Sequence, residues 1–352
     1  MSDFTMRIMR KNTTNATDIP LTISSKEGLI NQNDFFNKQV ASKDMSGYYL
    51  LHRGEYAYNK SYSVGYDFGS IKRLEKYDMG ALSTLYICFA LTKFNSDFIK
   101  HYFDSLKWYR EIYMISAEGA RNHGLLNVPT EDFFATLHTL PTDEAEQAKI
   151  ASFLDALTAR IEKQRSLVEN LKKYKRGLLS TIFSKVTTFV HLKDICEYAS
   201  SAKTMSQIDN TPKGAYPVYD AGGVAAFVDF YDMDTNYIAI IKDGSGVGRL
   251  QFCQAESSFI GTLGGLIPKN CSAFYLYTAL QTIDFKEYVT GMAIPHIYYK
   301  DYKYAMLPYP CEKDRAKIQV IFQNLDCKIT NAEMLLEKFN EMKKSLLQQL
   351  FI

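Results

Sequence analysis

Two long stretches of the chain place apolar residues alternately three and four positions apart. In the first stretch the seam runs through Ile150, Leu154, Leu157, Ile161, Gln164, Val168, Leu171, Lys175, Leu178 and Ile182. In the second it runs through Ile318, Phe322, Leu325, Ile329, Ala332, Leu336, Phe339, Lys343, Leu346 and Leu350. This spacing, kept over several heptads, is typical of a coiled coil. We therefore expect two long helices whose large apolar seam residues form a helix–helix interface.

The two seams belong to an internal repeat. Residues 144–184 align with residues 312–352 at a constant offset of 168, and twelve aligned positions are identical. Lys175 and Lys343 share one seam position, where a polar residue usually sets register at a cost in stability. Solenoid repeats are much shorter, so the pattern predicts a domain, a helix, a second domain and a second helix.

Both helices are expected to start after Leu-Pro and an acidic stretch and to carry basic residues late. Proline outside a helix and acids in its first turn suit its N-terminus. The late cations either complement the helix dipole on a solvated face or contact phosphate: Lys172, Lys173, Lys175, Arg176, Lys343 and Lys344. Each helix of about 40 residues spans roughly 60 Å. Antiparallel pairing would place one domain near each end.

The remaining segments predict an α+β fold with an internal pseudo-twofold repeat. We expect domains at 1–140 and 187–306 and helices within 141–186 and 307–352. Alternating apolar residues and turn signals predict these elements of the first domain: strands at 47–55, 56–60, 69–74 and 81–89 and a helix at 94–112. The second domain is expected to repeat the strands of 47–55, 69–74 and 81–89, in that order, and then the helix: 237–244, 248–252, 260–267 and 273–288.

Composition narrows the class of protein. The 352 residues are 46% hydrophobic, enough for two cores, and no apolar run approaches the length of a membrane span. The six cysteines contain no Cys-x-x-Cys, and the first residues resemble neither a signal nor a transit peptide, so we expect a cytoplasmic protein. The formal charge of +2 is low for a nucleic-acid binder, so any DNA contact would depend on local patches.

No pattern of catalytic residues stands out. Gly244-Ser245-Gly246-Val247-Gly248 could be a nucleotide-binding loop, but Arg249 replaces the third glycine of the dinucleotide fingerprint and a strand-like run follows. A glycine-rich hairpin is the better interpretation. The histidines show no metal-ligand spacing, and no nucleophile elbow or Walker loop is present. We therefore predict a chain without an active site, a metal or a cofactor of its own.

At this point the chain resembles a known family, the specificity subunits of type I restriction-modification enzymes. The resemblance covers nearly the whole sequence and rests on the domain–helix order, the Leu-Pro-acidic helix starts and the helix endings at 172–179 and 342–351. The phrases at 118–127 and 56–60 also look like target-recognition domains of that family. One departure concerns residues 190–196, which resemble the family's usual domain start, whereas nothing before Met6 is expected to play that role.

The resemblance implies a non-catalytic, DNA-reading subunit. Each domain would read one half of a bipartite double-stranded DNA site, and the helices would space the halves and dock two methyltransferase subunits. Restriction subunits would join the same complex. S-adenosylmethionine would belong to the methyltransferase chains, which form N6-methyladenine, and ATP with Mg²⁺ to the restriction chains. The length of the helices limits the spacing between domain centres to about 18 base pairs.

Polar residues in the corresponding loops are the candidates for base contacts, since base edges are read mainly by Arg, Lys, Asn and Gln. The candidates are Asn59, Lys60, Lys72, Arg73, Arg121, Asn122 and His123 in the first domain and Lys242, Ser245, Arg249, His296 and Lys300 in the second. A solvated surface charge is the alternative for each cation, and a hydrogen-bonded loop histidine for His123 and His296. Two other functions stay open: a coiled-coil scaffold that organises protein partners without reading DNA, and an enzyme in its own right.

Overall fold

The computed structural model describes residues 1–36, 42, 44–116, 126–291 and 294–351. The chain divides into two compact units. Unit 1 comprises Met1–Gln164 and Leu335–Ile352, and unit 2 comprises Arg165–Met334. Each unit therefore contains one α+β module together with a part of each long helix.

The long helices are α5 (Glu144–Phe183) and α10 (Glu312–Leu350). Asp143 accepts the Ala145 N–H at 2.8 Å and caps the start of α5. In unit 1 the Arg160 guanidinium lies 5.7 Å from the Phe339 ring centroid. The helices run antiparallel there, because Leu154, earlier in α5, shares a core with Leu347, later in α10.

In unit 2 the two helices also run antiparallel. Lys172 pairs with Glu333 at 2.6 Å, and Lys175, further along α5, pairs with Asp326 at 2.6 Å, earlier in α10. All sixteen expected interface residues are buried or partly buried: Ile150, Leu154, Leu157, Ile161, Val168, Leu171, Leu178, Ile182, Ile318, Phe322, Leu325, Ile329, Leu336, Phe339, Leu346 and Leu350. Towards the modules, the seam residues become part of the module cores.

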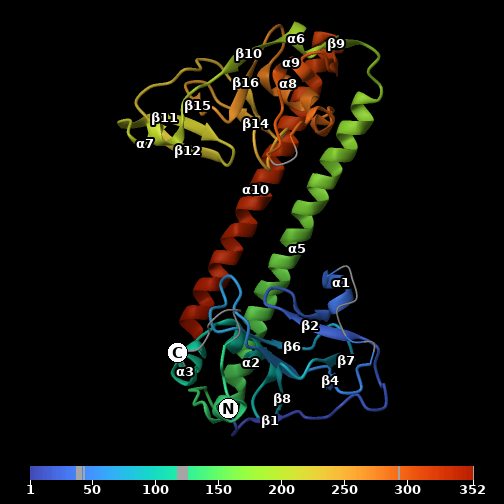
Figure 1. The fold of residues 1–352 in the computed structure, drawn as a ribbon, viewed down its shortest axis with the longest axis vertical. Helices are drawn as coiled ribbons and strands as arrows, with labels where there is room; N and C mark the ends of the chain where they lie inside the picture. Colours follow the sequence, from blue (N-terminus) through green and yellow to red (C-terminus); the bar gives the residue numbers. More distant parts are fainter. Residues whose placement is uncertain (37–41, 43, 117–125, 292–293, 352) are drawn as a thin grey trace. The chain divides into compact units, whose positions relative to one another are not determined.

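The module of unit 1 is built on two four-stranded sheets (Figure 1). The first has the order β1-β8-β5-β6 and the second the order β3-β2-β7-β4. The strands are β1 (Thr5–Arg7), β2 (Pro20–Ser24), β3 (Gly28–Asn31), β4 (Tyr49–His52), β5 (Tyr56–Asn59), β6 (Ser70–Arg73), β7 (Met79–Leu82) and β8 (Ile87–Leu91). The helices are α1 (Gln32–Phe36), α2 (Ser96–Asp104), α3 (Tyr109–Ile115) and α4 (Thr130–Ala135).

The module of unit 2 has sheets of the orders β10-β16-β13-β14 and β12-β11-β15, and a two-stranded sheet of β17 and β9. Its strands are β9 (Phe189–His191), β10 (Cys196–Ser200), β11 (Lys213–Asp220), β12 (Gly223–Val228), β13 (Tyr237–Ile241), β14 (Leu250–Cys253), β15 (Ser258–Phe259), β16 (Leu263–Pro268) and β17 (Met306–Pro308). Its helices are α6 (Leu192–Ile195), α7 (Met205–Asp209), α8 (Ala273–Leu280), the 3-10 helix η1 (Phe285–Tyr288) and α9 (Tyr299–Tyr302).

Strand pairing shows that the two modules share one topology. Sheet β1-β8-β5-β6 corresponds to β10-β16-β13-β14, and β3-β2-β7 corresponds to β12-β11-β15. In both modules the second sheet contains one parallel pair, β2 with β7 and β11 with β15. The counterpart of β4 in unit 2 is the single bridge between Met233 and Ser257. The predicted match of 237–244 with 47–55 is therefore wrong, since β13 corresponds to β5.

Two further expectations differ from the structure. The strand expected at 81–89 is divided between β7 and β8, which lie in different sheets, because a turn joins Tyr86 N–H to the Ser83 carbonyl. The helix expected at 94–112 breaks into α2 and α3 around Leu106, whose φ of 63° is left-handed. The helix expected at 273–288 similarly ends at Leu280 before η1.

Residues 1–4 carry a counterpart of residues 192–195, contrary to the expectation that nothing before Met6 plays this role. Ser2 N–H donates to the Phe134 carbonyl at 2.8 Å, as Lys193 N–H donates to the Lys303 carbonyl at 3.0 Å. β1 then pairs with β8 as β10 pairs with β16. The sequence comparison missed this correspondence because the equivalence lies in backbone hydrogen bonds, whereas the side chains have diverged.

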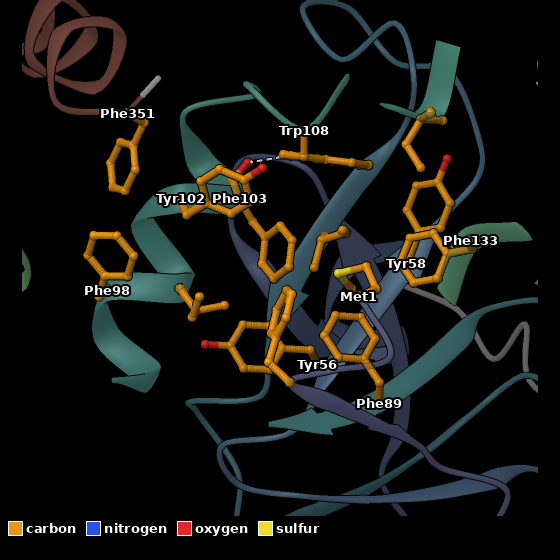
Figure 2. Packing of buried hydrophobic residues seen from close by; sticks show 14 of the residues in the cluster. Met1, Tyr56, Tyr58, Phe89, Phe98, Tyr102, Phe103, Trp108, Phe133 and Phe351 are labelled. Atoms are coloured by element: carbon orange, nitrogen blue, oxygen red, sulfur yellow. Dashed lines mark hydrogen bonds between the residues drawn. The ribbon is translucent and has the colours of Figure 1, made fainter. Parts of the chain in front are cut away.

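Aromatic rings dominate the core of unit 1 (Figure 2). Trp108 is 1% exposed and its indole N–H donates to the Phe103 carbonyl at 2.9 Å, which satisfies its one polar atom. Phe351 follows the last turn of α10 and lies near the Phe98 and Tyr102 rings, with centroids 5.3 and 5.8 Å away. The end of the chain's second long helix thus completes the core that the first residues begin.

Candidate nucleic-acid interface

In unit 2 a glycine-rich turn projects from the module sheet. β13 and β14 pair antiparallel, with Ile240 opposite Leu250, and the turn joins them. Gly244 and Gly248 have φ of 88° and 81°, which favours glycine. A Cβ at Gly248 would lie 2.8 Å from the Phe285 Cβ, so this position also needs a small residue. The hairpin interpretation of the glycine motif is confirmed, and a strand rather than a helix follows it.

A second loop lies against this turn and brings His296 to it. The His296 Nδ1 lies 2.6 Å from the Asp243 Oδ1. Backbone bonds join the two segments, from Gly244 N–H to the Pro295 carbonyl at 3.0 Å and from Ile297 N–H to the Lys242 carbonyl at 2.9 Å. A carboxylate only accepts, so the proton lies on Nδ1 and the Nε2 of neutral His296 remains an acceptor.

Lys242, Ser245 and His296 are thus brought together, and Lys300 lies nearby in α9, which follows the loop. The Lys300 ammonium lies 5.4 Å from the Tyr298 ring centroid, and the His296 and Tyr298 rings are 6.3 Å apart at 21°. Asp243 is a residue that the sequence did not indicate. Its position two residues after the buried strand β13 was the available signal.

Arg249 has a structural contact as well as an exposed position. Its Nη2 donates to the Ala221 carbonyl at 2.7 Å, and the Gln251 amide donates to the Asp220 carbonyl at 2.9 Å. Both side chains therefore hold the turn between β11 and β12 against β14. Gly222 N–H donates to the Asp220 Oδ1 at 2.6 Å, which closes that turn. The two turns together form a polar edge of the module, where Ser245 and Arg249 are exposed.

In unit 1, two of the candidates for base contacts are held in ion pairs within the module. Lys72 pairs with Asp104 at 2.7 Å, and its side chain is 14% exposed. Arg73 binds Glu75 and Asp97, both at 2.7 Å. These pairs favour a structural role for the two cations, because a base would have to displace their carboxylates.

The remaining candidates of unit 1 divide into two groups. Asn59 and Lys60, at the end of β5, are partly exposed, and the Asn59 Oδ1 accepts the Ser61 N–H at 3.0 Å. The other three candidates, Arg121, Asn122 and His123, lie outside the described residues.

The described residues give little support for a catalytic nucleophile or a metal site. Burial raises the pKa of the Cys88, Cys196 and Cys253 thiols to about 12, so these thiols are poor nucleophiles. No group of three or more His, Cys, Asp or Glu residues in the described ranges is placed to hold a metal ion. None of the helices in the part of the chain that the structure describes is long and apolar enough to cross a membrane.

Comparisons with known proteins agree with this fold. Residues 185–339 match the family described as type I restriction modification DNA specificity domain. The type I restriction enzyme MjaVIII specificity subunit of Methanocaldococcus jannaschii is 26% identical over 175 residues, which are 46% of this chain and 41% of that protein. This match therefore spans less than half of the curated relative.

Two solved structures share the fold along almost the whole chain. The S subunit of a type I restriction-modification system from M. genitalium has a TM-score of 0.62 at 18% identity, over 98% of this chain and 99% of that one. A chain from a type I restriction-modification structure on complex assembly and conformational transition has a TM-score of 0.57 at 16% identity, over 99% and 95%. The α+β fold with two long helices is confirmed, and with it the resemblance to type I specificity subunits.

Proposed function

We propose that this chain is the DNA-recognition subunit of a type I restriction-modification enzyme. Each module, within 1–140 and 187–306, would read one half of a bipartite site, and the helices within 141–186 and 307–352 would link the two readers. The observation that supports this most strongly is the repeated strand topology, because both units carry the same scaffold with different loops. Such a scaffold suits the recognition of two different half-sites.

Catalysis would take place in partner chains. Two methyltransferase subunits would bring S-adenosylmethionine and form N6-methyladenine, and restriction subunits would bring ATP with Mg²⁺. Base contacts would come from Asn59, Lys60, Arg121, Asn122 and His123 in the first module and from Lys242, Ser245, Arg249, His296 and Lys300 in the second. Lys72 and Arg73 would support the first module through their ion pairs. A chain that reads chromosomal DNA in a bacterium or archaeon would work in the cytoplasm.

The test is to co-express the chain with a type I methyltransferase subunit and to map N6-methyladenine across the genome. We expect a motif of two short halves separated by a fixed gap. Arg249→Ala should change only the half read by the second module. Lys269→Ala is the matched control, because Lys269 is also an exposed cation of unit 2 but pairs with Glu197 at 2.9 Å.

Methylation without any motif, or a complex that forms without binding DNA, would contradict the proposal. It would support the scaffold function, which the nearly balanced charge of the chain also suits. Methyl transfer or cleavage by the purified chain alone would contradict the absence of an active site.

A further inference from the structure

The two lysines in the helix seams occupy equivalent positions but different surroundings. In unit 2 the Lys175 ammonium lies 2.6 Å from the Asp326 carboxylate and 5.8 Å from the Tyr277 ring centroid. Its side chain is 17% exposed. The positive charge of Lys175 is therefore neutralised within the unit.

Lys343 in unit 1 has neither of these neighbours. The residue that precedes Asp326 by the repeat offset of 168 is Thr158, whose hydroxyl donates to the Leu154 carbonyl at 2.8 Å. Tyr277 and Lys100 occupy equivalent positions, each five residues after the N-cap residue of its helix. Unit 1 therefore has a lysine where unit 2 has the tyrosine ring. Within the described residues no ion pair joins Lys343 to a carboxylate.

The nearest acids of unit 1 are already engaged. Asp155 lies 2.8 Å from both Lys100 and His101, and Asp104 binds Lys72. His101 is fully buried, and its Nδ1 has no hydrogen-bond partner within the described residues. The partly buried Lys343 and the His101 ring thus border the same space.

That space is a cavity of about 260 Å³ with an excess of positive charge. Six cations line it: Lys26, Lys72, Arg73, Lys76, Lys100 and Lys343. Four carboxylates line it as well, those of Glu27, Glu75, Asp104 and Glu162. An adjoining cavity of about 320 Å³ shares Lys26, Lys72 and Lys343 and adds Lys344.

Physical chemistry favours an anion in this cavity. Burial lowers the pKa of Lys343, and the neighbouring Lys100 and Lys72 lower it further, against the opposite effect of Asp104 and Asp155. A bound oxyanion would offset both the burial of the Lys343 ammonium and its repulsion by Lys100 and Lys72, because it accepts charge-assisted hydrogen bonds. The cavity has room for a phosphate group with a few waters.

We propose that this cavity of unit 1 is a phosphate-binding site, with Lys343 as its central cation. The phosphate is either free or part of a DNA backbone, since both present the same oxygens. The proposal selects Lys343 among the late helix cations for phosphate contact, whereas Lys172 and Lys175 are held by carboxylates.

The first experiment titrates the full chain with inorganic phosphate, at constant ionic strength with chloride as the control, and follows binding by calorimetry. We expect saturable binding to the unaltered chain. Lys343→Gln and Thr158→Asp should each weaken it by roughly tenfold or more, the effect of one charge-assisted hydrogen bond. Thr158→Asp supplies the acid that unit 2 has, so this variant should fold at least as stably as the unaltered chain without phosphate.

Lys175→Gln is the matched control and should leave phosphate binding unchanged. Equal phosphate binding by the unaltered chain and Thr158→Asp, or no saturable binding at all, would overturn the proposal. Because this titration contains no DNA, its result is independent of the proposed function.

A second experiment identifies the source of the phosphate. It measures DNA affinity against salt concentration for the assembled complex, with the unaltered chain and with Lys343→Gln. A DNA phosphate in the site predicts a slope of log K against log salt that is smaller by about one in the variant. An unchanged slope assigns the site to free phosphate.

Discussion

Units 1 and 2 share a scaffold but differ in their loops and in the charges on their helices. The strand orders agree, and each unit closes its core with parts of α5 and α10. In contrast, unit 1 carries α1 between β3 and β4, whereas unit 2 carries α7 between β10 and β11. Lys175 is ion-paired, whereas no ion pair joins Lys343 to a carboxylate in the part of the chain that the structure describes. Backbone pairing and seam packing therefore define the fold, and the loops and charges can diverge upon it.

The largest effect is expected from two equivalent core residues, Leu154 in unit 1 and Phe322 in unit 2, each 0% exposed. Truncation of a buried Leu or Phe to Ala costs about 2–5 kcal/mol. We expect Leu154→Ala to destabilise unit 1 and Phe322→Ala to destabilise unit 2, as measured by hydrogen exchange in each unit. The controls Phe153→Ala and Ile321→Ala, at equivalent exposed positions, should have little effect. Equal loss of protection in both units would show that they do not unfold separately.

The next largest effect is expected at low pH, where unit 1 should lose stability through His138. The His138 ring accepts or donates hydrogen bonds to Tyr102 and Thr136 at 2.7 and 2.8 Å, and burial lowers its pKa to about 4. Between the ordinary pKa of 6.5 and about 4 the unfolded chain binds a proton that the folded unit does not, so unit 1 loses stability as pH falls. The loss approaches about 3 kcal/mol.

The control for this acid effect comes from unit 2. The backbone bond from Leu192 to Ala305 matches that from Met1 to Thr136, which makes the buried Leu307 the counterpart of His138. His138→Leu should flatten the pH dependence of unit 1 in urea unfolding between pH 4 and 7. An unchanged pH dependence in this variant would place the acid-sensitive group elsewhere.

A third prediction separates the modules by what they read. Asn59→Ala should relax the half-site of the first module only, and His296→Ala that of the second only. Each loss should amount to about 1–3 kcal/mol of discrimination, as for a base contact. Competition binding with half-site variants measures this, and an effect of either variant on both half-sites would contradict two independent readers.

The smallest effect is expected at the exposed ion pair of Lys172 and Glu333, whose side chains are 48% and 44% exposed. Surface pairs contribute about 0–1 kcal/mol. Glu333→Gln should therefore change the thermal unfolding of unit 2 only slightly, and less in high salt. Asp326→Asn, which leaves the less exposed Lys175 unpaired, should cost more. The reverse order would mean that burial does not control the strength of these pairs.

The sequence predicted the helices better than the modules, for physical reasons. A seam such as Ile150 to Ile182 repeats along one element, so its period is visible without a partner. Strand pairing is non-local, and the correspondence of β5 with β13 depends on hydrogen bonds that side-chain patterns do not specify. The Asp243–His296 contact likewise joins residues 53 positions apart. The ion pair of Lys175 also joins residues that are distant in sequence. The sequence alone therefore did not distinguish the surroundings of Lys175 from those of Lys343.

The division of the chain into a continuous unit 2 and a discontinuous unit 1 has a consequence for protein synthesis. Unit 1 needs residues near both ends of the chain, because Phe351 packs beside Phe98 and Tyr102. A ribosome that has produced residues 1–334 has made all of unit 2 but has not yet made the part of α10 that unit 1 requires. Unit 1 begins first and is completed last, so the nascent chain must keep its aromatic core from aggregating until the second helix emerges.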